Sequence, residues 1–357
     1  MKQEFIELLK QLIACAPVSA DIPAVNRASA VMEDFLQAHG VRVVREVIDG
    51  RNTLYASLLP EGKETEVLFN AHLDVVPLST PDQNQAVIRD GRLYGRGAGD
   101  CLGQAVVIAQ ILCDNPGKSA AAIFTTNEEI GGSTTAEMLA RGYRGTRGAI
   151  ILDAWFENAV ACAEKGMMDV QITAHGKGGH AAHPWEAVNA IDLLMEGYRK
   201  LQAAWQNPTS EANWEDTISA TGITCSSTAH NVIPETASLC CNIRFIQPGA
   251  EAEIIKKIQT LTGLEDVKLL NSCVPVFCNE ENEFLQSYRR IAKDITGQEC
   301  GIQRMHGATD ARHVAALYPE LPIVVTGAHH GNIHNTDEWL DLDDTDTIIR
   351  ICSEVLK

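Results

Sequence analysis

Several histidines and carboxylates stand where predicted strands end, and these residue types suit a metal site. They are His72, Asp74, Glu128, Glu129, Asp153, His329, His330 and His334. Ligands gather outside the carboxyl ends of strands in open α/β sheets. Nitrogen and oxygen ligands without a cysteine pair suit zinc, manganese or cobalt. Singly, each residue has an ordinary alternative as a cap or a core side chain. Together, buried carboxylates need a cation nearby, which favours a metal site.

The stretch GRGAGDCLGQ places one more carboxylate, Asp100, between a glycine-rich turn and a helix expected over 101–113. Glycines let a backbone approach other groups closely and adopt conformations that a Cβ would forbid. Asp100 is therefore interpreted either as the cap of the helix or as a metal ligand, and the two roles are compatible.

The pattern of apolar residues predicts an α/β domain that carries an insertion. Helical and strand patterns alternate in the N-terminal half, which indicates a sheet with helices on both faces. Beyond residue 167 the order becomes strand, helix, strand, strand, helix, strand, with a long helix over 186–205, as in ferredoxin-like domains. We therefore expect a catalytic domain over 1–167 and 278–357, and an inserted domain over 168–277.

Composition narrows the possible partners. The chain has 357 residues and a net charge of -18, which argues against a surface for nucleic acid or anionic membranes. No apolar stretch approaches the roughly 20 residues of a membrane-spanning helix. Eleven cysteines without a CxxC pair favour a reducing compartment, so a cytoplasmic location is expected.

Separated motifs in one order resemble a known enzyme family. They are HLDVVP, GRGAGD, TNEEIGG, the aspartate of AIILDAW, GKGGHAAHP and IHN. The chain is similar along nearly its whole length to the co-catalytic zinc hydrolases typified by acetylornithine deacetylase, succinyl-diaminopimelate desuccinylase, aminoacylase and glutamate carboxypeptidase. The resemblance implies a zinc-peptidase catalytic domain with a mixed sheet, and an inserted ferredoxin-like domain that acts as a lid and forms a homodimer.

The resemblance also implies the metal ligands and the acid–base residues. His72 and Asp153 would bind one zinc ion, Glu129 and His334 the other, and Asp100 would bridge the two. Manganese or cobalt remain possible in place of zinc.

Two further residues receive roles from the same motifs. Asp74 would orient the imidazole of His72. Glu128 would act as general base toward the attacking water and then protonate the leaving amine.

The inserted domain and the C-terminal region supply the remaining implied residues. His180 would reach a partner subunit's active site and stabilise the developing oxyanion, with an exposed lid histidine as the alternative. Asn231, Arg244 and Arg312 would bind a substrate carboxylate, although Arg244 equally suits a structural salt bridge.

The chain departs from the family pattern at two places. Cys101, Leu102 and Gly103 follow the bridging aspartate, where the family usually has a large residue, Lys and Gly, and where the peptide bond is usually cis. Asp153 stands where deacylases and carboxypeptidases mostly have Glu, and where aminopeptidases and dipeptidases have Asp.

We therefore expect a metal-dependent amidohydrolase that acts on an N-acyl amino acid or on a short peptide with a free carboxylate. A dipeptidase or aminopeptidase is the alternative within the family, and a binding protein that kept the fold is the alternative outside it. A nucleotide-binding oxidoreductase is disfavoured, because glycines at 95, 97, 99 and 103 do not reproduce GxGxxG.

Overall fold

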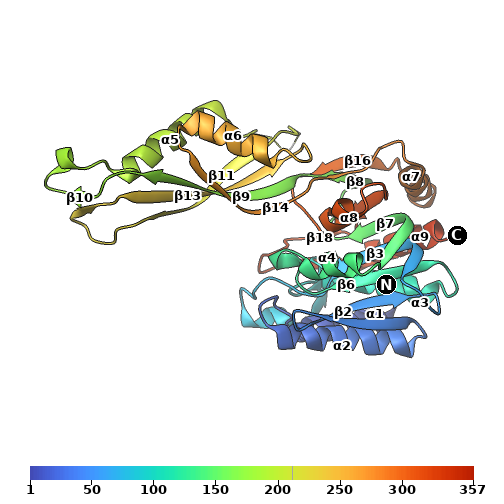
Figure 1. The fold of residues 1–357 in the computed structure, drawn as a ribbon. Helices are drawn as coiled ribbons and strands as arrows, with labels where there is room; N and C mark the ends of the chain where they lie inside the picture. The colour runs from blue at the N-terminus through green and yellow to red at the C-terminus, as the bar shows by residue number, and fades with distance from the viewer. Residues whose placement is uncertain (211) are drawn as a thin grey trace. The chain divides into compact units, whose positions relative to one another are not determined.

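The computed structural model describes residues 1–210 and 212–357. The chain divides into two compact units, shown as ribbons in Figure 1. The first unit comprises Met1–Ala163, Phe277–Arg304 and Thr309–Lys357, and the second comprises Glu164–Val276 and Met305–Ala308. The short segment Met305–Ala308 belongs to the second unit, whereas the sequence pattern assigned it to the catalytic domain.

A mixed sheet of nine strands forms the centre of the first unit, in the order β1-β2-β6-β3-β7-β17-β8-β15, with β16 beside β8. β6 and β7 run parallel to β3, and β17 runs parallel to β7, whereas β1, β2 and β8 pair antiparallel. The strands are β1 (Arg42–Ile48), β2 (Arg51–Ser57), β3 (Glu64–His72), β6 (Ala120–Thr125), β7 (Arg144–Leu152), β8 (Ala159–Glu164), β15 (Val276–Phe277), β16 (Gly301–Met305) and β17 (Ile323–Thr326).

Helices cover both faces of this sheet, as the alternating sequence pattern predicts. Val67, Phe69 and Ala71 of β3 share a core with α1, α2, α3, α7 and α9. Figure 1 shows α4 and α8 on the side of the sheet opposite α1, α2 and α3. The helices are α1 (Gln3–Ala14), α2 (Ile22–Ala38), α3 (Leu102–Asp114), α4 (Ser133–Ala140), α7 (Glu283–Thr296), α8 (Ala311–Leu317) and α9 (Leu342–Val355).

A small antiparallel sheet joins two segments that are distant in the sequence, in the order β18-β19-β5-β4. Trp339 of β19 pairs with Tyr94 of β5, so the chain just before the glycine turn lies beside the chain just after His334. The strands of this small sheet are β4 (Val87–Arg89), β5 (Arg92–Tyr94), β18 (His330–Gly331) and β19 (Trp339–Asp341). The first unit also contains the 3-10 helices η1 (Pro81–Asn84) and η2 (Glu128–Ile130).

The second unit is a four-stranded antiparallel sheet, in the order β11-β13-β9-β14, with α5 and α6 packed on one face. Its six longer elements follow the predicted order of strand, helix, strand, strand, helix, strand. The elements are β9 (Gly166–His175), β10 (Gly179–His180), η3 (Pro184–Glu186), α5 (Ala190–Ala204), β11 (Thr217–Cys225), β12 (Val232–Ile233), β13 (Thr236–Phe245), α6 (Glu251–Thr262) and β14 (Asp266–Cys273).

The long helix of this unit begins four residues later than the sequence pattern predicts. Pro184 opens the 3-10 turn η3, and the side chain of Asn189 accepts a hydrogen bond from the Ile191 N–H at 3.0 Å. An Asn at this position caps the first turn, so α5 begins at Ala190 rather than at residue 186. Within the described residues, none of the helices has the length and the apolar character needed to cross a membrane.

Candidate metal centre

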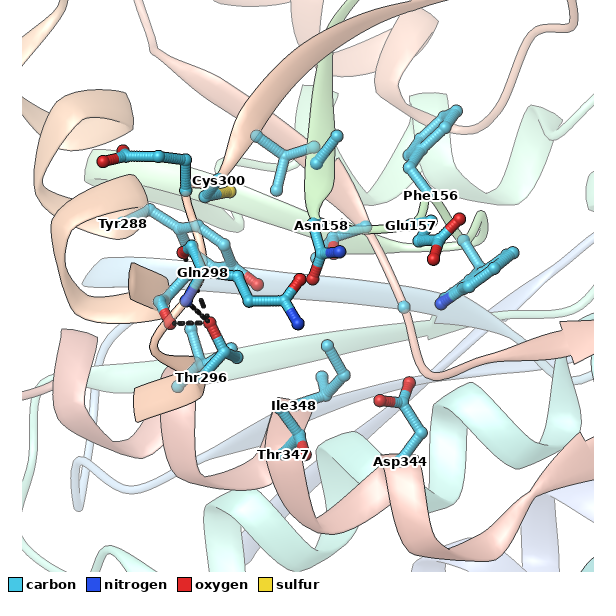
Figure 2. Close-up of a pocket in the computed structure, with 18 residues that line it drawn as sticks. Phe156, Glu157, Asn158, Tyr288, Thr296, Gln298, Cys300, Asp344, Thr347 and Ile348 are labelled. Atoms are coloured by element: carbon cyan, nitrogen blue, oxygen red, sulfur yellow. Dashed lines mark hydrogen bonds between the residues drawn. The ribbon is translucent and has the colours of Figure 1, made fainter. Parts of the chain in front are cut away.

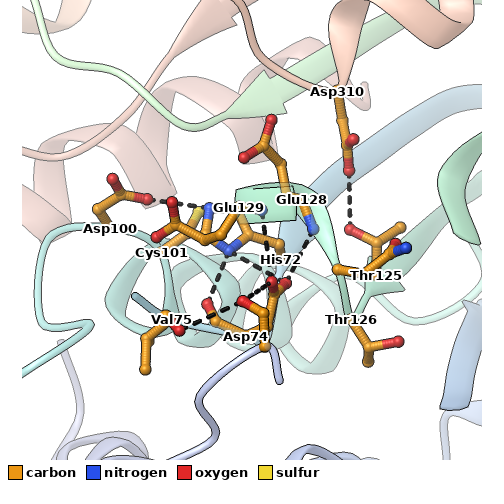
Figure 3. A network of polar contacts seen from close by, with 12 residues as sticks. His72, Asp74, Val75, Asp100, Cys101, Thr125, Thr126, Glu128, Glu129 and Asp310 are labelled. Atoms are coloured by element: carbon orange, nitrogen blue, oxygen red, sulfur yellow. Dashed lines mark hydrogen bonds and ion pairs between the residues drawn. The ribbon is translucent and has the colours of Figure 1, made fainter. Parts of the chain in front are cut away.

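The carboxyl ends of adjacent strands bring the predicted ligands to one edge of the central sheet. β3 ends at His72, Asp153 follows the last residue of β7, and β6 leads into η2, which contains Glu128 and Glu129. Because β3 is parallel to both β6 and β7, these ends meet. Figure 3 shows His72, Asp100 and Glu129 converging there.

The glycine turn brings Asp100 to the same place, and two of its glycines have no room for a Cβ. Gly97 has φ 84°, and a Cβ at this position would lie 2.7 Å from the Leu102 side chain. A Cβ at Gly99 would lie 2.8 Å from the Cβ of His330. The Asp100–Cys101 peptide bond is cis, as is usual in the resembled family, and α3 begins at the next residue.

The two carboxylate oxygens of Asp100 face different histidines. His72 Nε2 lies 2.9 Å from Asp100 Oδ1 and 3.5 Å from Asp153 Oδ1. His334 Nε2 lies 3.1 Å from Asp100 Oδ2 and 3.3 Å from Glu129 Oε2. The five predicted ligands therefore form two groups of one nitrogen and two oxygens that share Asp100.

The donor atoms fit divalent cations. His72 Nδ1 lies 2.9 Å from the Asp74 carbonyl oxygen, which only accepts, so the Nδ1 carries the proton. With a cation bound, the Nε2 atom of a neutral His72 would offer its lone pair beside the carboxylates of Asp100 and Asp153. Glu129 Oε1 is buried and has no hydrogen-bond partner among the described residues. A buried carboxylate oxygen without a protein partner is costly, and metal coordination removes that cost.

The charges of the cluster also favour bound cations. Burial opposes the charged form of Asp100, but hydrogen bonds from His334 and His72 hold the pKa of its carboxyl well below the usual range. Hydrogen bonds to Asp100 and Glu129 raise the pKa of His334 to about 10. Burial raises the pKa of Asp153 to about 6. The three carboxylates among the predicted ligands outnumber the two histidines, a balance that bound cations would complement.

Cys101 lies within the cluster but acts as a neutral donor. The ligand-type atoms of His72, Cys101 and Asp153 lie within 4.8 Å of one another, as do those of His72, Asp100 and Glu129. However, the Cys101 Sγ–H donates to the Leu152 carbonyl at 2.9 Å, and burial raises the pKa of the thiol well above its ordinary value. We therefore assign the carboxylate oxygens, and not the Cys101 sulfur, as the predicted metal ligands beside the histidines.

Asp74 ties His72 to the segment that carries the two glutamates. Its carboxylate is fully buried, accepts from the Ser19 hydroxyl at 2.6 Å, and accepts from the N–H groups of Glu128 at 3.1 Å and Glu129 at 3.4 Å. Asp74 thus fixes η2 as well as the tautomer of His72. The contribution of Ser19 was missed in the sequence, because nothing in its own segment points to residue 74.

The Glu128 carboxylate contacts Arg312 of α8. Its Oε1 lies 2.9 Å from Arg312 Nη2, and both side chains are nearly buried. Burial raises the pKa of the Glu128 carboxyl well above its ordinary value, and the carboxylates of Asp153 and Asp310 act in the same direction. Arg312, predicted to bind substrate, is therefore a partner of the predicted base in this structure.

Glu338 and Arg96 hold the glycine turn and were also missed in the sequence. Glu338 Oε1 accepts from the N–H groups of Gly99 at 3.1 Å and Asp100 at 3.0 Å, and its Oε2 pairs with Arg96 Nη1 at 2.6 Å. Both side chains are buried. Arg96 stands inside GRGAGD and Glu338 lies four residues after His334, so the charged residues next to the motifs were the available signal.

The remaining predicted residues belong to the second unit. His180 of β10 is exposed, and its Nδ1 accepts from the Ala182 N–H at 3.0 Å. Asn231 is exposed beside it, where its carbonyl accepts from the Ala181 N–H at 2.9 Å. Arg244 of β13 donates from Nε to Asn242 Oδ1 at 3.1 Å. The structure thus groups His180 with Asn231 and places Arg244 apart from them on the sheet.

Comparison with known proteins identifies a family of metal-dependent hydrolases. A model of peptidase family M20/M25/M40 matches residues 68–357, so the chain belongs to this family. The predicted family resemblance and α/β fold are thereby confirmed.

Individual relatives span nearly the whole chain. A succinyl-diaminopimelate desuccinylase of Burkholderia ambifaria is 28% identical over 99% of this chain and 98% of its own. The structure of an M20 family metallo-carboxypeptidase from Sulfolobus solfataricus matches with a TM-score of 0.80 and 17% identity over 100% of this chain and 99% of that one. Aminopeptidase PepT of Bacillus cereus matches with a TM-score of 0.79 and 18% identity over 99% of both chains.

Proposed function

We propose that this metal-dependent hydrolase cleaves the amide bond of an N-acyl amino acid, or of a short peptide with a free carboxylate, and that it uses two zinc ions per chain. The observation that carries the proposal is Asp100, whose two oxygens face His72 and His334. When bound at these residues, two metal ions would supply positive charge that lowers the pKa of a water and polarises the scissile carbonyl. Manganese or cobalt suit the same ligands.

In the proposed reaction Glu128 moves the proton. Its burial and its anionic neighbours raise its affinity for protons, which suits a carboxylate that receives a proton and passes it on. It would take a proton from the attacking water and deliver it to the nitrogen of the leaving amine. Arg312, at 2.9 Å, holds the carboxylate in place before substrate binds. We propose that Arg312 then also contacts the substrate carboxylate.

For the second unit we propose the role of lid and dimerisation domain. His180 would stabilise the oxyanion in a partner subunit's site, and Asn231 and Arg244 would bind the substrate carboxylate. Support for this comes from the exposed positions of His180 in β10 and of Asn231 just before β12. A cytoplasmic location stays a prediction.

A dipeptidase or aminopeptidase is the second candidate, because Asp153 occupies the position where those relatives have Asp. Human carnosine dipeptidase matches this chain with a TM-score of 0.70 and 16% identity, a likeness that concerns the fold. The choice of substrate therefore requires direct measurement.

Substrate panels combined with one variant test the proposal. We would measure metal content and amine release from N-acetyl and N-succinyl amino acids and from dipeptides. Glu128→Gln should retain the metal but lose at least about 100-fold in kcat, the usual contribution of general acid–base catalysis. Glu137→Gln, on the exposed surface of α4, is the matched control and should remain active. Full activity of Glu128→Gln, or a purified chain that binds no metal, would contradict the proposal and favour a binding protein.

A further inference from the structure

A buried carboxylate outside the predicted ligand set joins both ends of the segment that carries Glu128. Asp310 stands directly before α8 and is 1% exposed. Its Oδ2 accepts from the hydroxyl of Thr125, at the end of β6, at 2.8 Å (Figure 3). The same oxygen accepts from the hydroxyl of Thr135, in α4, at 2.5 Å. Because Glu128 lies between these two threonines in the chain, Asp310 fastens both flanks of the segment 125–135.

Asp310 does not perform the usual task of an aspartate at the start of a helix. Such an aspartate usually accepts a hydrogen bond from an N–H group of the first helical turn. The Asp310 side chain makes no bond of this kind, and the Thr309 hydroxyl instead accepts from the Ala311 N–H at 3.2 Å. The carboxylate of Asp310 is directed into the core, where an anion is costly unless it is bonded or paired.

The second carboxylate oxygen of Asp310 lies beside Arg312, the partner of Glu128. This Oδ1 is buried and has no hydrogen-bond partner among the described residues, with His313 Nε2 at 3.7 Å. It lies 2.4 Å from the point where Gly132 would carry a Cβ, and Arg312 Nη2 lies 3.1 Å from the same point. The same Nη2 is 2.9 Å from Glu128 Oε1. The negative charge of Asp310 therefore borders the guanidinium group that contacts Glu128.

We propose that Asp310 is a positioning residue for Glu128. Its Oδ2 holds the segment 125–135 in place, and its charge holds the Arg312 guanidinium where that group contacts the Glu128 carboxylate. The link to catalysis rests on the proposed function, in which Glu128 moves the proton. A general base must lie within hydrogen-bond reach of the proton that it accepts, so a small displacement of this segment lowers the rate of the chemical step.

Hydrogen exchange measures the hold on the segment without reference to activity. In the metal-loaded protein we expect Asp310→Asn to exchange the amide protons of residues 125–135 at least about 10-fold faster, the usual effect of losing a charged hydrogen bond. Thr347→Val is the control and should leave this exchange unchanged, because Thr347 lines a separate cleft beside α7 and α9 (Figure 2). Unchanged exchange in a folded Asp310→Asn protein would overturn the proposal.

A double-mutant cycle tests whether Asp310 acts through Glu128. In the metal-loaded enzyme with its best substrate, Asp310→Asn should lower kcat at least about 10-fold, while the metal content stays unchanged. Glu128→Gln removes the proposed base, so the addition of Asp310→Asn to it should cause no further loss of kcat. Losses that add in the double variant would overturn the proposal, because they would show that Asp310 affects the reaction independently of Glu128.

The two measurements separate this proposal from the proposed function. Full activity of Glu128→Gln would contradict the proposed function and the catalytic link, whereas the exchange of residues 125–135 decides separately whether Asp310 holds the segment. Thr135→Val removes one of the two hydroxyl donors and provides the test if Asp310→Asn unfolds. It should speed the same exchange about 3- to 10-fold, the usual effect of losing a neutral hydrogen bond. Unchanged exchange in a folded Thr135→Val protein would likewise overturn the proposal.

Discussion

At the scale of residues, the metal centre depends on one shared carboxylate. His72 and His334 come from segments far apart in the chain, and Asp100 lies within 3.1 Å of a ring nitrogen of each. Asp153 and Glu129 each contact a single histidine. Loss of Asp100 therefore affects both groups of ligands, whereas loss of Asp153 affects one.

This difference gives a prediction for metal content. We expect Asp100→Ala to bind less than one metal per chain, and Asp153→Ala to retain the ion held by Glu129 and His334. Metal content after dialysis, measured by elemental analysis, gives the comparison. Asp169→Ala, in the second unit, serves as the control because Asp169 bonds Asn242 and no predicted ligand. Full metal content in Asp100→Ala would exclude the bridging role.

A second residue-scale prediction concerns stability and pH. Hydrogen bonds from Tyr143 and Arg141 lower the pKa of Glu46 below its ordinary value of 4.5. Because the pKa of Glu46 is lower in the folded state, its ionised carboxylate stabilises the fold. That stabilisation is fully present above pH 4.5 and is lost as the pH falls through the folded-state pKa of Glu46. We expect Tyr143→Phe to cost about 1 kcal/mol at neutral pH and less in acid. Urea unfolding at neutral pH and in acid measures the cost of the substitution under each condition. An equal cost under both conditions would contradict the prediction.

The predicted and the missed residues of the site differ in how local their signals are. His72, Glu128 and Asp153 stand at the ends of apolar strands, where residue type and position together indicate chemistry. Ser19 and Glu338 act through contacts with Asp74 and with the backbone of Asp100, which lie 55 and 238 residues away in the sequence. Such contacts follow from the tertiary fold, and no pattern in the local sequence specifies them.

At the scale of elements, the turn that carries Asp100 is held by a carboxylate from another segment. Glu338 accepts from two N–H groups of the turn and pairs with Arg96, and the side chains of Glu338 and Arg96 are buried. Residues that orient a metal ligand typically change metal affinity without touching the metal.

We therefore expect Glu338→Gln to weaken metal binding by about 10- to 100-fold, the usual effect of changing such a partner. The amide keeps one acceptor oxygen, but it removes the charge that balances Arg96. Competition with a metal chelator measures the affinity, and Glu354→Gln on α9 is the control. Circular dichroism separates this effect from unfolding. A folded Glu338→Gln protein with unchanged metal affinity would show that the turn holds its shape alone.

Long elements were predicted from the sequence, and short ones were not. The strands β3, β7, β9 and β13 and the helix α3 carry enough apolar residues for their period to be visible. The strands β4, β5 and β19 have three residues each, and β10, β12, β15 and β18 have two. A period of two cannot be recognised over so few residues, so the small sheet that links the glycine turn to the His334 segment remained hidden.

At the scale of the whole molecule, two compact units carry different parts of the predicted machinery. The first contains the metal ligands, Glu128 and Arg312, and the second contains His180, Asn231 and Arg244. The proposed dimer follows from the implied role of His180 in a partner's site.

This proposal predicts that oligomeric state and activity change together. We expect a dimer in analytical ultracentrifugation, and we expect His180→Ala to lose at least about 100-fold in kcat while the dimer and the metal content persist, as for loss of an oxyanion donor. His175→Ala is the control, since His175 is exposed and pairs with Asp266 of the same unit. A fully active monomer would exclude the contribution of a second subunit.

The reactivity of the Cys101 thiol can report how often the start of α3 opens. All eleven cysteines are free, Cys225 is exposed, and Cys101 is buried where α3 begins beside the metal centre. A thiol reagent will modify Cys225 at once, but it reaches Cys101 only when the start of α3 separates from Leu152. The rate of labelling at Cys101 is measured by mass spectrometry with and without zinc. It gives the frequency at which the start of α3 opens and the degree to which bound metal suppresses that opening.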